Sequence, residues 1–123
     1  MSVLHEVIGY AIVAGFGFFM LWGFGAWIFK REPGPWFWRL LAILQVTIAI
    51  QVVAGAILLG IHGFDARPKL HYLYGSVLPI IVLVIGHVMA RELERDQWKV
   101  FAVAGFICFG LTLRALMTGL GIG

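Results

Sequence analysis

Residues 7–29 read VIGYAIVAGFGFFMLWGFGAWIF, a run of 23 residues with no lysine, arginine, aspartate or glutamate. A helix needs about 20 mostly apolar residues to cross the hydrocarbon core of a bilayer, so this run predicts a membrane span. Three further uncharged runs follow, at residues 40–61, 70–90 and 100–113, and Arg114 alone separates the last run from an uncharged C-terminus. We therefore expect nearly all of the 123 residues to lie in membrane helices or in the turns between them.

The composition excludes several classes of protein. Charged residues make up 12% of the chain and hydrophobic residues 62%, whereas a soluble domain typically carries about 25% charged residues. A soluble enzyme and a nucleic-acid-binding domain are therefore excluded, and no nucleic-acid partner is expected. The one cysteine, Cys108, can form neither an internal disulfide nor a thiol-exchange pair.

Proline, glycine and charged residues fill three short connections, at residues 30–39, 62–69 and 90–99. None is long enough to separate two domains, so residues 1–123 are expected to form a single transmembrane domain, with the lipid bilayer as its surroundings. Long helices joined by tight turns favour an all-α, up-down-up-down four-helix membrane bundle. We expect its helices at about residues 5–29, 38–61, 70–90 and 99–120.

The distribution of basic residues predicts the orientation. The second connection holds Arg67 and Lys69, whereas the first and third together hold Lys30, Arg31, Arg39, Arg91, Arg95 and Lys99. Cytoplasmic loops carry an excess of lysine and arginine, so we expect the first and third connections inside and both termini outside. The expected location is the cytoplasmic (inner) membrane of a prokaryote.

Two histidines occupy equivalent positions in the predicted bundle. His5 begins the first helix and His71 begins the third, and both helices run from the outer to the inner face. The first and third helices of an up-down bundle can lie diagonally across its core. Two imidazoles that face each other across such a core can bind a haem iron from both sides. We therefore predict that His5 and His71 are the iron ligands of one haem b per chain.

A glycine follows each of these histidines after four residues. Gly9 follows His5 and Gly75 follows His71, so each glycine shares a helix face with its histidine, about 6 Å deeper along the helix axis. Such notches would provide the clearance that a flat macrocycle needs. The alternative is that the glycines only allow close packing of membrane helices.

Four further residues are candidates for the outer end of a haem site. Arg67, Lys69 and His62 lie in the outer connection, and Arg114 lies on the outer half of the fourth helix, where they could contact the haem propionates. Two alternatives stay open: His62 as an ordinary loop residue, and Arg114 as a side chain that extends to the membrane surface. His87 has no second histidine opposite it at the inner end, and we expect it to be structural.

Three segments carry a resemblance to a known family. HEVIGY at residues 5–10 precedes an apolar helix and a basic turn, QVVAGA follows at residues 51–56, and KLH at residues 69–71 opens the third helix. Over residues 4–90 this pattern resembles one half of the heme A synthase family. The resemblance implies a four-helix bundle in which the two histidines bind a b-type haem.

The sequence also departs from that family. The family's glutamate three residues before the first histidine is implicated in catalysis, but Ser2 stands at this position, and Glu6 lies on a different helix face. The paired outer-loop cysteines of many members are absent, and the chain has half the family's length. Two copies could assemble as the two halves do. The resemblance therefore favours haem binding over haem modification.

The leading hypothesis is a membrane b-type cytochrome that transfers electrons to a quinone, a periplasmic carrier or a larger respiratory complex. A half-size heme A synthase-like oxidoreductase, acting as a homodimer, is the first alternative. The second alternative is an accessory membrane subunit without a cofactor. The predicted cofactor-binding residues are His5, Gly9, His62, Arg67, His71, Gly75 and Arg114.

Overall fold

The computed structural model describes residues 3–63 and 69–121, nearly all of them helical. The third span is divided into three consecutive segments, α3, η2 and α4, and the other spans are single helices. The elements are α1 (Val3–Ile28), α2 (Pro35–His62), α3 (Lys69–Tyr72), η2 (Leu73–Val77), α4 (Leu78–Arg91) and α5 (Gln97–Gly119). Four helices are long and apolar enough to cross a membrane, which confirms the predicted all-α four-helix membrane bundle.

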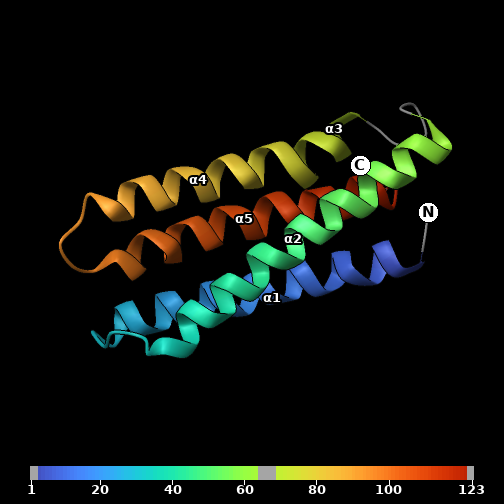
Figure 1. The fold of residues 1–123 in the computed structure, drawn as a ribbon. Coiled ribbons are helices and arrows are strands. Elements are labelled where there is room, and N and C mark those ends of the chain that lie inside the picture. The colour runs from blue at the N-terminus through green and yellow to red at the C-terminus, as the bar shows by residue number, and fades with distance from the viewer. Residues whose placement is uncertain (1–2, 64–68, 122–123) are drawn as a thin grey trace.

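The spans alternate in direction, as predicted (Figure 1). The start of α1, the end of α2, α3 and the end of α5 gather at one end of the bundle, which we call the outer end. The turns after α1 and α4 lie at the opposite, inner end (Figure 1). Helix α5 packs against α1 and α4, and α1 packs against α2, whereas α2 meets the third span mainly at η2. Helix α1 and the third span are therefore diagonal to each other.

Local backbone chemistry sets the limits of α2. Pro35 occupies the start of the helix, directly after Gly34. Proline is tolerated at this position because its missing N–H would have no helical partner there, so α2 begins three residues before the expected start at residue 38. At the other end, Gly63 has a φ of 89° and its N–H donates to the carbonyl of Leu59. A left-handed φ favours glycine, and this residue ends the helix.

The third span differs from the single helix that the sequence predicts. Its outer part contains a π-helical turn, η2, in which the N–H of Leu78 donates to the carbonyl of Leu73. Pro79 follows directly; its ring would clash with the carbonyl four residues earlier in a regular α-helix, and it has no N–H to donate. The wider turn relieves this conflict. Single π-helical turns occur often at functional sites, and this one begins two residues after His71.

The packed core fills the inner part of the bundle. Phe16, Phe19 and Phe37 are completely buried, and the rings of Phe19 and Phe37 stack with centroids 4.2 Å apart. Beside them α1 and α5 approach closely, because a Cβ at Gly23 would lie 2.7 Å from the Cβ of Ala102 and 3.1 Å from its Cα. The small residues thus provide the close helix contact that membrane bundles favour.

This contact gives a test of the fold. Gly23→Ala should destabilise the protein by ~1–3 kcal/mol, because the added methyl meets backbone atoms of Ala102 that cannot turn aside. Gly25→Ala is the matched control, since a Cβ at Gly25 has no neighbour within 4 Å. Reversible unfolding in mixed micelles measures both free energies. Equal stability of the two variants would contradict the packing described.

Candidate functional site

A cavity of about 450 Å³ occupies the outer end of the bundle. Residues of α1, α2, α5 and the first part of the third span line it, and most of the lining is apolar. Pockets for cofactors and other small molecules commonly measure about 300–1,000 Å³ and are mostly apolar with a few placed polar groups. The cavity has both the size and the composition of such a site.

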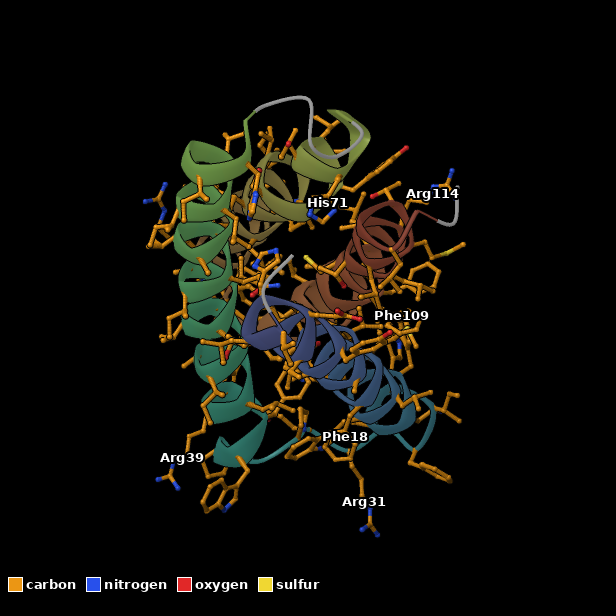
Figure 2. The ribbon with its side chains drawn as sticks, turned by 90° about the vertical axis from the view of Figure 1, so that its right-hand side faces the viewer. Phe18, Arg31, Arg39, His71, Phe109 and Arg114 are labelled. Carbon is orange, nitrogen blue, oxygen red and sulfur yellow. The ribbon has the colours of Figure 1, made fainter. Side chains whose placement is uncertain are left out.

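The cavity brings together five of the residues predicted from the sequence. His5 and Gly9 line it from α1, His62 from the end of α2, and His71 and Gly75 from the third span. Figure 2 shows His71 pointing into the space between the helices. The sequence predicts that His5 and His71 lie at the same depth, and in the structure both side chains line one cavity.

The imidazoles of His5 and His71 face each other from diagonal spans. Their ring centroids are 6.3 Å apart and their planes are inclined by 75°. Imidazole nitrogens bind zinc at about 2.0–2.1 Å, so two rings on opposite sides of one transition metal ion have centroids ~6 Å apart. The rings are thus spaced as two ligands of a single metal ion would be.

A backbone hydrogen bond fixes the tautomer of His71. Its Nδ1 lies 2.8 Å from the carbonyl oxygen of Ala115 in α5. A carbonyl oxygen can only accept, so Nδ1 carries the proton and the lone pair is on Nε2. Metal-binding histidines commonly donate their second ring N–H to such a carbonyl, which orients the ring and raises its basicity.

Helix α2 supports His5 on the opposite side of the cavity. The side-chain amide of Gln51 donates from Nε2 to the backbone carbonyl of His5 at 2.7 Å. One turn further, a Cβ at Gly55 would lie 3.3 Å from Cε1 of His5 and 3.9 Å from Nε2. Gln51 and Gly55 share one helix face, and together they hold α2 against the first turn of α1.

The glycines nearest the imidazole rings are not the two predicted. A Cβ at Gly9 would lie 3.4 Å from Nε2 of Gln51, and one at Gly75 would lie 3.6 Å from the Cβ of Ala115, which are ordinary contacts. A Cβ at Gly119 would lie 2.7 Å from Cε1 of His71 and 3.0 Å from its Nδ1. The contacts of Gly55 with His5 and of Gly119 with His71 were not predicted, because neither glycine lies in the same helix as its histidine.

The remaining predicted residues lie elsewhere. Arg114 does not line the cavity, and its side chain points away from the space between the helices (Figure 2). The expected contact of Arg114 with haem propionates therefore stays a prediction, beside the alternative that its side chain extends to the membrane surface. Arg67 lies outside the described residues. His87 lies toward the inner end of α4, where its Nε2 is 2.6 Å from Oε1 of Gln45. This bond between α4 and α2 gives His87 a structural partner.

Residues 3–63 and 69–121 offer few side chains that could bind a metal ion. No group of three or more histidine, cysteine, aspartate or glutamate side chains there could hold a metal ion. The two imidazoles could therefore serve a metal whose other ligands belong to a bound cofactor.

The chain matches no known family model, no curated protein and no solved structure. The resemblance of three segments to the heme A synthase family stays a prediction. The function is therefore inferred from the geometry of the cavity.

The tautomer of His71 is a direct prediction of this geometry. Nitrogen-15 NMR of the protein with labelled histidine should show His71 protonated at Nδ1. Gly119→Ala should abolish this tautomer signal, because the methyl group displaces the ring from Ala115. Gly110→Ala, where a Cβ has no neighbour within 4 Å, should preserve it. A wild-type protein with His71 protonated only at Nε2 would contradict the hydrogen bond.

Proposed function

We propose that the chain is an integral membrane b-type haem protein in which His5 and His71 bind the iron from opposite sides. The observation that carries the proposal is the pair of imidazoles with centroids 6.3 Å apart in one apolar cavity. The hydrogen bond from Nδ1 of His71 to the carbonyl of Ala115 supports it, because it leaves Nε2 available as the ligand atom.

The ligand count favours a haem over a bare metal ion. Structural metal sites usually need four protein ligands, and the described cavity offers two imidazoles that face each other. A haem brings four nitrogens of its own and a large, mostly apolar ring. Ile12, Ile48 and Leu116 are among the cavity residues suited to contact that ring.

Ligation by two histidines favours electron transfer. A haem held by His5 and His71 would supply one-electron iron chemistry. The hydrogen bond of His71 to Ala115 and that of Gln51 to the His5 backbone would keep both side chains in place while the group gains or loses an electron. The chain would accept one electron from a donor and pass it to an acceptor.

The position of the cavity supports the proposed location of the haem near the outer membrane face. The first and third connections, which are the richer in lysine and arginine, lie at the inner end of the bundle (Figure 1). The cavity lies at the outer end, among residues of the first turns of α1 and the last turns of α2. By the positive-inside rule, the proposed haem then lies near the outer face of a prokaryotic cytoplasmic membrane. A quinone, a periplasmic carrier or a larger respiratory complex would exchange electrons there.

One observation favours the enzymatic alternative. Glu6 lines the same cavity as His5, so a carboxylate is available beside the proposed haem, as in a heme A synthase-like enzyme. Such an enzyme, acting as a homodimer, would produce hydroxylated or formylated haem. Mass spectrometry of haem extracted from cells that express the chain distinguishes the two functions: unmodified haem b supports the cytochrome, and a modified haem supports the enzyme.

Difference spectroscopy tests the proposed ligands. The purified protein should show the sharp α-band of low-spin b-type haem when the oxidised spectrum is subtracted from the reduced one. His5→Ala and His71→Ala should each lose low-spin haem, because each removes one axial ligand. His87→Ala is the control and should retain it, since His87 bonds to Gln45 and neither residue lines the cavity.

Two results would contradict the proposal. Absence of haem from purified wild-type protein, measured by the pyridine haemochrome assay, would favour the accessory subunit without a cofactor. Loss of low-spin haem in His87→Ala, together with its retention in His5→Ala and His71→Ala, would place the ligands elsewhere.

A further inference from the structure

The carbonyl of Ala115 receives two side-chain donors. Nδ1 of His71 donates to it at 2.8 Å, and the hydroxyl of Thr118 donates to it at 2.9 Å. Oγ1 of Thr118 itself lies 3.5 Å from Nδ1 of His71. Thr118 is completely buried, so its hydroxyl has no access to solvent in this structure.

These donors compete for one oxygen atom. A carbonyl oxygen has two lone pairs, and a helical carbonyl also accepts the N–H four residues later, which here belongs to Gly119. Three donors thus share two lone pairs. The hydroxyl of Thr118 draws electron density from the oxygen and weakens the bond that the oxygen makes with His71.

The strength of the His71 bond has a consequence for a bound metal. A stronger bond from Nδ1–H makes the imidazole more basic and a better electron donor through Nε2. A better donor stabilises ferric iron relative to ferrous iron and lowers the reduction potential. Hydrogen bonding to a ligand is one of the ways in which a protein adjusts haem potential.

We propose that Thr118 is a positioning residue that raises the reduction potential of the bound haem by limiting the hydrogen bond between His71 and Ala115. The inference rests on the proposed haem ligation. It assigns a role to a buried hydroxyl of a residue that does not line the cavity.

Redox titration of three variants tests the proposal. Thr118→Val keeps the shape of the side chain but removes the hydroxyl, and should lower the midpoint potential. The expected change is roughly threefold to tenfold in the ferric–ferrous equilibrium constant, where tenfold corresponds to about 59 mV. Thr118→Ser keeps the hydroxyl and should retain the wild-type potential.

Thr47→Val is the control. Thr47 lies in α2, and its hydroxyl donates to the carbonyl of Ile43, four residues earlier in the same helix, at 2.7 Å. Thr47 does not line the cavity, and the carbonyl that it binds is not the one that accepts from His71, so the variant should keep the wild-type potential. An unchanged or raised potential in Thr118→Val, or an equal fall in Thr47→Val, would overturn the proposal.

NMR of haem-free protein provides a second measurement. The Nδ1 proton of His71 should move downfield in Thr118→Val, because its hydrogen bond becomes stronger, and should not move in Thr47→Val. If the wild-type protein binds haem but this proton and the potential are unchanged, the role of Thr118 is wrong and the proposed function stands. If the protein binds no haem, the proposed function fails, and the role of Thr118 in setting the potential fails with it.

Discussion

At Gly23 the backbone of α1 lies so close to Ala102 of α5 that a single added methyl group would meet it at 2.7 Å. This contact joins the two helices at the inner end, where the aromatic core is packed around Phe19 and Phe37. Lipid satisfies no backbone polar group, so the spans must stay helical along their length. The distance between helices can still vary along the bundle. The helices pack closely at the inner end, and they enclose the cavity at the outer end.

All four spans contribute residues to the cavity at the outer end. Helix α1 and the third span each provide one imidazole, from diagonal positions. Their neighbours hold those imidazoles in place: Gln51 of α2 binds the backbone of His5, and the carbonyl of Ala115 in α5 binds the ring of His71. Each histidine is thus positioned by a helix other than its own, and neither α2 nor α5 is a passive spacer.

The spans and the pair of histidines could be predicted from sequence because they depend on one-dimensional properties. Runs of uncharged residues define membrane helices, and alternating directions place His5 and His71 at one depth. The contacts of Gly55 and Gly119 could not be predicted, since they depend on which helix faces meet. Arg114 lies at the predicted depth, but the rotation of α5 about its axis turns it away from the cavity.

The π-helical turn η2 shows a second limit of sequence reasoning. A run of apolar residues has the same hydropathy whether it forms α-helical or π-helical turns. The sequence of residues 70–90 therefore predicts one continuous helix. Pro79 lies within this span, but whether a proline kinks, breaks or widens a helix depends on its neighbours. Ser76 lies in this turn, and its hydroxyl donates to the carbonyl of Tyr72 at 2.6 Å, a type of bond that often bends helices.

The proposed function requires one haem iron between His5 and His71. Electron paramagnetic resonance of the oxidised, purified protein is the sharpest test, because the signal reports the two ligands of the iron and the angle between their planes. We expect low-spin ferric haem with two imidazole ligands and the large g-anisotropy of nearly perpendicular rings, consistent with the 75° between the planes. A high-spin signal, or the absence of any haem signal, would contradict it.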